Sequence, residues 1–171
     1  MKKTAILLVA LVMSAFAMSA QKFALVDMEY VLGNIPAYEI ANEQLDQMSQ
    51  KWQKEVEAVS QEAQNMYKDY QANMVFLTDE QKKKREADVV AKEKAAVELR
   101  NKYFGPEGEL YKKRVALMQP IQDDVYNAIK AVAERYQYQC IFDRASSVDI
   151  IFASPTIDIS NEVLKILGYS N

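Results

Sequence analysis

The sequence predicts a mainly helical α+β protein: a long antiparallel helical hairpin that projects from a small β-sheet body, which oligomerisation completes. Three observations support this prediction. Residues 37–136 are rich in charge and carry apolar residues at helical spacing with few interruptions. A helix-start signal divides this stretch near residue 78. Short segments near the two ends of the chain have the apolar, β-branched and aromatic composition of strands.

The first arm of the predicted hairpin begins after residue 36. Its apolar residues recur at steps of three or four, with a mean of about 3.67, the period of a straight or slightly right-handed helical stripe. A helix of this length, on the order of 55 Å, is too long for one small globule, so we expect it to protrude. The apolar residues are Ala41, Leu45, Met48, Trp52, Val56, Val59, Ala63, Met66, Tyr70 and Met74.

The predicted tip of the hairpin lies near residues 75–79, where an apolar run ends and a helix-start signal follows. Thr78 and Gln81 have the spacing of a capping box, in which each side chain accepts a hydrogen bond from the other residue's backbone N–H. Asp79 and Glu80 fall in the first turn, where the helix dipole favours negative charge. One helix is therefore expected to end, and the next to begin, at this point.

The second arm is predicted to run to residue 136, with an apolar seam at every seventh position. This seam consists of Val90, Val97, Phe104, Tyr111, Met118, Val125 and Val132. The companion positions are polar in the first half, so the seam is thin there, and apolar in the second half: Val115, Ile121, Ile129 and Tyr136. Between the halves lie two glycines and a proline that favour a break in the helix. We interpret them as an arm hinge: Gly105, Pro106 and Gly108.

Residues 1–20 have the composition of a secretory signal peptide. Two lysines follow Met1, an apolar run extends from Ala5 to Met13, and small residues surround the expected cleavage site, between Ala17 and Ala20. The apolar run is too short to span a bilayer. We therefore expect export across the inner membrane and a soluble mature protein that does not insert stably into a membrane.

The segments 21–36 and 137–171 are predicted to form one oligomerisation body. We expect a strand at 23–27, a short helix that ends near residue 33, an antiparallel hairpin of strands at 138–143 and 148–153, and a final helix before Gly168. So small a body leaves sheet edges unpaired and apolar faces in water, which predicts an obligate homo-oligomer. The residues expected to build it are Phe23, Leu25, Val26, Cys140, Ile141, Phe142, Ile150, Ile151 and Phe152.

The composition argues against an enzyme. Histidine, the commonest general base and metal ligand near neutral pH, is absent. Cys140 is the only cysteine, so no internal disulfide can form, and we expect it to be a small buried hydrophobic residue. No phosphate-binding loop or nucleophile motif occurs. We predict no catalytic residue, no cofactor and no metal site. The net charge of −3 disfavours nucleic acid as a partner.

The first arm and the tip carry the residues expected to contact other proteins. Methionine and aromatic side chains form adaptable apolar surfaces of low specificity. Most of them are expected to pack arm against arm, but the thin facing seam should leave some without a full partner. Several such arms on one oligomeric body would enclose a cavity that holds an unfolded chain through many weak contacts. The candidate binding residues are Met48, Trp52, Val56, Met66, Tyr70, Met74, Phe76 and Leu77.

Five features follow one another along the chain: the signal peptide, the strand KFALVD at 22–27, the charged hairpin, CIFD at 140–143, and DISNEVL at 158–164. This order resembles the OmpH/Skp family of periplasmic chaperones over the whole mature chain. The resemblance implies a homotrimer with a β-barrel-like body and three helical arms. It also implies a periplasmic holdase that keeps unfolded outer-membrane β-barrel proteins soluble without ATP.

The charge of the chain departs from this family, because its best-known members are strongly basic and this chain is acidic. We therefore carry over no lipopolysaccharide or lipid site, and we expect apolar contacts to contribute more to binding. The basic run at 82–85 is interpreted as a solvated helix face rather than a phosphate site. A second function stays open: a structural coiled-coil spacer or adaptor of the cell envelope that docks a fixed partner through the hairpin tip.

Overall fold

The structure is a computed structural model of the 171-residue chain, and it describes residues 22–146 and 150–169. The predicted signal peptide and the first two residues of the predicted strand at 148–153 lie outside the described residues. The chain divides into two compact units. The hairpin unit comprises residues 36–123, and the body unit comprises the described residues before 36 and after 123. The sequence had placed the second boundary at residue 136, at the end of the arm.

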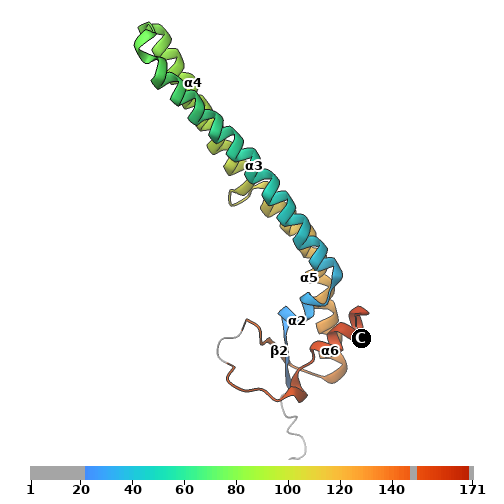
Figure 1. Cartoon of the computed structure of the whole chain (residues 1–171). Coiled ribbons are helices and arrows are strands. Elements are labelled where there is room, and N and C mark those ends of the chain that lie inside the picture. The colour runs from blue at the N-terminus through green and yellow to red at the C-terminus, as the bar shows by residue number, and fades with distance from the viewer. Residues whose placement is uncertain (1–21, 147–149, 170–171) are drawn as a thin grey trace, which may run out of the picture. The chain divides into compact units, whose positions relative to one another are not determined.

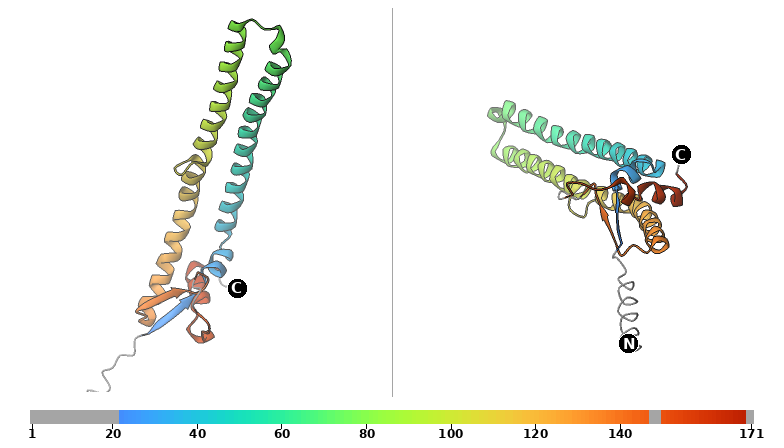
Figure 2. Two further views of the ribbon diagram at one scale, coloured as in Figure 1. Left: turned by 90° about the vertical axis from the view of Figure 1, so that its left-hand side faces the viewer. Right: turned by 90° about the horizontal axis from the view of Figure 1, so that it is seen from below.

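Two long helices dominate the hairpin unit. Helix α3 (Pro36–Asn73) leads through a 3-10 turn, η1 (Met74–Phe76), to α4 (Asp79–Phe104). Helix α5 (Glu109–Tyr136) follows, and its first half belongs to the hairpin unit. Helices α3 and α4 run antiparallel and side by side, as Figures 1 and 2 show. The predicted hairpin, its turn and its helix boundaries are thus confirmed.

The apolar stripe predicted along the first arm forms the packed face of α3. Five of its residues are buried: Ala41, Leu45, Val56, Ala63 and Tyr70. Near the start of α3, the first two pack with Met118 of α5 in an apolar cluster, which Tyr38, Leu110, Leu117 and Ile121 surround. Because this stripe persists over the whole helix, one face of α3 remains in contact with its partner helices throughout the unit.

The seam predicted for the second arm is wrong by one residue in α4. Val89 and Ala96 are the buried residues, whereas Val90 and Val97 are 62% and 58% exposed. Beyond the break, Met118, Val125 and Val132 are buried as expected. The remaining predicted seam and companion residues that proved to be exposed are Tyr111, Val115 and Tyr136.

The partners available on α3 explain which register of α4 is adopted. Tyr103 lies on the same helix face as Val89, fourteen positions later, and its ring stacks on Trp52 with the ring centroids 4.8 Å apart. Lys92, on the same side, forms an ion pair with Glu62. Rotating α4 to bury Val90 would move both side chains away from these partners.

The break predicted in the second arm is confirmed, since α4 ends at Phe104 and α5 begins at Glu109. The turn is tight: the Gly105 N–H donates to the Asn101 carbonyl, and the Gly108 N–H donates to the Gly105 carbonyl, each at 2.9 Å. A Cβ atom on Gly105 would lie 2.4 Å from that Asn101 oxygen, so the turn requires glycine there. Hinge motion about this break stays a prediction.

The body unit contains a two-stranded parallel sheet. Strand β1 (Phe23–Val26) pairs with β2 (Cys140–Asp143), with Phe23 opposite Cys140 and Val26 opposite Asp143 (Figure 2). Helix α2 (Met28–Gly33) packs on α6 (Ser160–Leu167), which ends at Gly168 with a positive φ of 83°, as the sequence predicted. The second half of α5 completes the core, whose fully or nearly fully buried members include Ala24, Val31, Val125, Val132 and Val163.

The antiparallel hairpin predicted at 138–153 is wrong. The described residues 150–153 have no regular secondary structure, and the chain then forms a 3-10 turn, η2 (Pro155–Ile157). After this turn it approaches the other edge of β1, where Ile159 donates a backbone hydrogen bond to Leu25 at 2.9 Å and Asp158 forms a bridge with Leu25. Because the chain returns beside β1, it does not double back along β2.

Candidate functional site

The tip of the hairpin is held in place by its polar residues and presents apolar side chains to solvent. The capping box forms as predicted: Gln81 N–H donates to Thr78 Oγ1 at 3.3 Å, and Thr78 N–H donates to Gln81 Oε1 at 2.9 Å. Between the two helices, Val75 and Phe76 are 78% and 83% exposed. Met74 is also exposed, and Leu77 is partly buried.

The structure separates the candidate binding residues of the first arm into two groups. Val56 and Tyr70 are buried in the seam between α3 and α4, and Trp52 stacks against Tyr103. These side chains stabilise the hairpin itself. Met48 and Met66 are partly buried. Of the predicted set, Met74 and Phe76 at the tip are therefore the most accessible to another molecule.

Three valines that the structure exposes were not among the predicted binding residues: Val75, Val90 and Val97. Val75 belongs to the apolar run before Thr78, so its position in the tip could have been recognised from the sequence. The other two were assigned to the seam because they recur at the seven-residue spacing that also describes the true seam. Nothing in α4 alone distinguishes these two stripes, which differ by a rotation of about 100°.

Polar contacts between the arms fix the register of α3 against α4. The Tyr103 hydroxyl donates to Glu55 Oε2 at 2.6 Å, and the Tyr70 hydroxyl donates to Glu86. The hydrogen bond to Glu55 is the main cause that raises the pKa of Tyr103, and desolvation and the charge of Glu55 add to it. The phenol therefore stays protonated, and able to donate, beyond its usual pH range.

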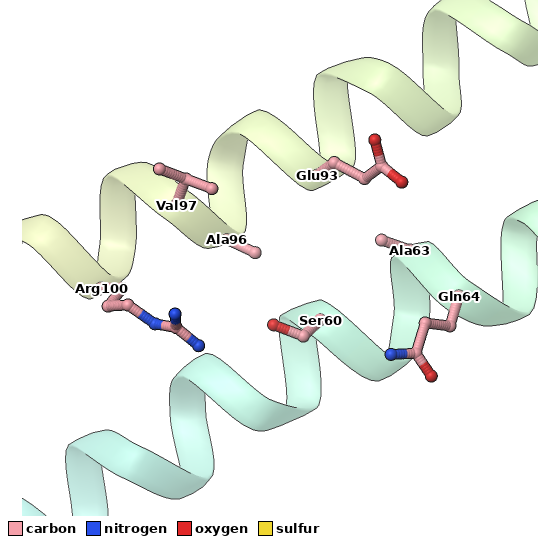
Figure 3. Close-up of a pocket in the computed structure, with 7 residues that line it drawn as sticks. All are labelled: Ser60, Ala63, Gln64, Glu93, Ala96, Val97 and Arg100. Atoms are coloured by element: carbon pink, nitrogen blue, oxygen red, sulfur yellow. The ribbon is translucent and has the colours of Figure 1, made fainter.

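A hollow of about 240 Å³ lies between α3 and α4 in the middle of the hairpin (Figure 3). Two small buried residues, Ala63 and Ala96, line its base because neither side chain is long enough to fill the space between the helices. Figure 3 shows Arg100 at one end of this hollow and Glu93 toward the other. The remaining lining residues are Ser60, Gln64 and Val97.

In the body unit, a network of polar side chains ties the two chain ends together. Ser160 Oγ accepts from the Asp27 N–H at 2.8 Å and donates to Asp158 Oδ1 at 2.6 Å. Arg144 Nη1 pairs with Asp158 Oδ2 at 2.9 Å. Partial burial raises the pKa of Asp158, but the hydrogen bonds from Ser160 and the guanidinium of Arg144 outweigh it, and the net effect lowers that pKa.

The residues predicted to build an oligomerisation body differ widely in exposure. Leu25 and Val26 are buried within the single chain. The expectation that Cys140 is buried is wrong, since its side chain is exposed among the described residues, at the start of β2. Ile141 is partly buried, and the other residues of the set are exposed: Phe23, Phe142, Ile150, Ile151 and Phe152.

Comparison with known protein families identifies the chain. A model of the outer membrane protein (OmpH-like) family matches residues 22–167, which covers both units. The chain belongs to the OmpH-like family. The fold is consistent with this membership, since a mainly helical chain with long helices and a small parallel sheet is the OmpH-like arrangement.

A solved structure resembles this OmpH-like chain in fold. It is the crystal structure of a candidate outer membrane chaperone (OmpH-like) from Caulobacter crescentus CB15. The two have a TM-score of 0.67 and 15% sequence identity, over 85% of this chain and 82% of that one. No curated protein matches the sequence significantly. Within residues 22–146 and 150–169, the OmpH-like chain contains no helix that is both long and apolar enough to cross a membrane.

Proposed function

We propose that this protein is an ATP-independent holdase chaperone of the periplasm, which binds unfolded outer-membrane proteins and prevents their aggregation. The observation that carries the proposal is the apolar tip of the hairpin, where Val75 and Phe76 are 78% and 83% exposed. Large apolar side chains exposed together commonly mark a surface that binds another molecule. Membership of the OmpH-like family, and the fold shared with a candidate outer membrane chaperone, support the same function.

The mechanism needs several copies of the chain. The exposed apolar residues of the body, above all Ile151 and Phe152 at 101% and 85% exposure, would be covered in a homotrimer. Its three hairpins would then surround a cavity that an unfolded chain enters. Each contact with methionine, valine or phenylalanine would be weak, but many contacts would act together at high effective concentration. Release then needs no nucleotide, because individual contacts break and re-form rapidly.

The proposal includes no catalytic step. The chain has no histidine and a single cysteine, and the Tyr103 hydroxyl is engaged in a hydrogen bond to Glu55 across the two helices. Its role would be to bind and release proteins without changing them chemically.

An aggregation assay tests the holdase function. A urea-denatured outer-membrane β-barrel protein is diluted into buffer with or without the mature protein, and light scattering is followed with time. A near-stoichiometric amount of trimer should suppress the rise in scattering, and a denatured protein of the same size that is rich in charge should be bound less well. Undiminished aggregation at several-fold excess of the mature protein would contradict the proposal.

A second candidate function is a structural spacer or adaptor of the cell envelope. The concentration of exposed apolar residues at the tip favours it, because one end of a hairpin is also a suitable docking point for a folded partner. A pull-down that compares wild type with Phe76→Asp distinguishes the two. The adaptor model predicts the complete loss of one folded partner. The holdase model predicts a modest decrease in the capture of many unfolded proteins.

A further inference from the structure

The two long sides of the α3–α4 hairpin, which we call its flanks, differ in the contacts that join the two helices. The seam residues of each helix face the other helix. In an antiparallel pair, the residues immediately after the seam residues of both helices lie on one flank of the hairpin. The residues immediately before the seam residues lie on the other flank. The second flank is closed by contacts between the arms: Glu55 accepts from Tyr103, and Glu62 pairs with Lys92. We call it the closed flank.

Among the described residues around its hollow, the first flank lacks such contacts, although nearer the tip the Tyr70 hydroxyl donates to Glu86 between the arms. We call it the open flank. It contains the hollow, with Ser60 and Gln64 on α3 and Glu93, Val97 and Arg100 on α4 (Figure 3). Helical spacing extends it toward the tip. Tyr67 lies seven residues after Ser60, and Val90 lies seven residues before Val97. Three apolar side chains of this flank are about half exposed or more: Tyr67 at 48%, Val97 at 58% and Val90 at 62%.

The ends of the hollow carry opposite charges that this hairpin does not neutralise. Among the described residues, neither Arg100 nor Glu93 forms a salt bridge, although Lys92, next to Glu93, forms one. Their positions are seven residues apart on α4, which corresponds to about 10 Å along the helix axis. An extended polypeptide spans that distance with about three residues. The hollow between them, at about 240 Å³, is large enough for an apolar side chain.

We infer that the open flank is a binding site for an extended segment of unfolded polypeptide. One aliphatic or aromatic side chain of that segment occupies the hollow over Ala63 and Ala96. A carboxylate or backbone carbonyl of the segment lies at Arg100, and a basic group or backbone N–H lies at Glu93. Val90 and Tyr67 provide further apolar contacts toward the tip. The inference rests on the proposed holdase function and names the part of the arm that performs it.

The size of this surface favours an unfolded segment over a second folded chain. A stable interface between folded proteins buries roughly 800 Å² on each partner. Two valines, one tyrosine and a small hollow provide far less than that, and the opposite charges at the hollow match the paired donors and acceptors of a polypeptide backbone. Binding through this flank should therefore be weak at each site and act together with the tip.

The test compares two substitutions on α4 that introduce the same charge. Val97→Asp places a carboxylate in the open flank, and Ala95→Asp places one at an exposed position two residues away, on the other side of the helix. The measurement is the affinity of the full mature protein for a fluorescently labelled, urea-denatured outer-membrane β-barrel protein. Val97→Asp should weaken binding roughly fivefold or more, as expected for the loss of one apolar contact, whereas Ala95→Asp should bind like wild type.

Photo-crosslinking provides a second measurement that does not depend on the stability of the aspartate variants. Benzoylphenylalanine in place of Val97 should form adducts with the denatured client, and the same group in place of Ala95 should form few. Equal adduct yields at the two positions, or equal affinities of the two aspartate variants, would overturn the inference while leaving the holdase function intact. Adducts between copies of this chain in place of the client would also overturn it. Failure of wild type to bind the client would overturn both proposals.

Discussion

Gly105 occupies a position at the end of α4 that only a residue without a side chain fits. Its N–H closes the last turn of the helix onto Asn101, and a Cβ atom would lie 2.4 Å from the same carbonyl oxygen. The φ of −64° is ordinary for any residue, so the requirement is steric. A break that the sequence suggested through its glycines and proline is therefore maintained by a specific contact with the helix backbone.

Replacement of this glycine gives the first prediction. Gly105→Ala should reduce the free energy of unfolding by about 1–3 kcal/mol, because the end of α4 must shift to relieve the clash. Gly33→Ala is the matched control, since no atom lies within 4 Å of the Cβ position there, and it should leave stability unchanged or slightly increased. Urea denaturation followed by circular dichroism measures both. Equal stability of the two variants would show that the contact does not constrain the turn.

Asp158 gives a prediction about pH. Its pKa is lowered in the folded protein, because the hydrogen bonds from Ser160 and the charge of Arg144 outweigh the effect of burial. A carboxyl group with a lowered pKa contributes stability that is fully present above its unfolded pKa, near 3.8, and is lost as the pH falls below that value. The stability of wild type should therefore decrease on acidification below about pH 4. Asp158→Asn should show a weaker decrease, and parallel curves would contradict this role.

Single residues also show where the sequence was and was not sufficient. Thr78 and Gln81 were predicted correctly as a capping box because both partners lie within one turn of the chain. The exposure of Cys140 was predicted wrongly because it depends on what covers a sheet face. That covering would come from residues distant in the sequence or from another chain, and no local pattern encodes it.

At the scale of the element, α4 presents two apolar stripes, and only its partner helix selects between them. The seven-residue spacing fits Val89 and Ala96 as well as Val90 and Val97. The choice depends on Trp52 and other residues of α3, more than twenty-five positions earlier in the chain. The sequence therefore predicted that α4 is a helix in a hairpin, but it could not predict which face of the helix is buried.

A pair of adjacent substitutions tests the seam. Val89→Lys should destabilise the hairpin by about 2 kcal/mol or more, because it places an ammonium group in the packed face. Val90→Lys should change stability by no more than about 0.5 kcal/mol, since it lies on an exposed face. Thermal denaturation followed by the helical circular dichroism signal compares them. A larger effect at Val90 than at Val89 would restore the register that the sequence suggested.

At the scale of the whole molecule, the chain brings its two ends into one sheet. Strands β1 and β2 pair in parallel although more than a hundred residues separate them. The composition of each strand was recognisable, but the sequence predicted β2 to pair with the segment after it. Pairing partners depend on long-range topology, and here the residues after β2 lie beside β1. The sequence also missed how much the second half of α5 contributes to the core of the body unit.

The central claim is that several copies of this chain assemble and hold one unfolded protein between their hairpins. Sedimentation velocity of the mature protein, alone and with a urea-denatured outer-membrane β-barrel protein, tests it most directly. Our account predicts a trimer by mass in the absence of client and a discrete, soluble complex in its presence. A monomer that stays free while the denatured protein sediments as aggregate would contradict it.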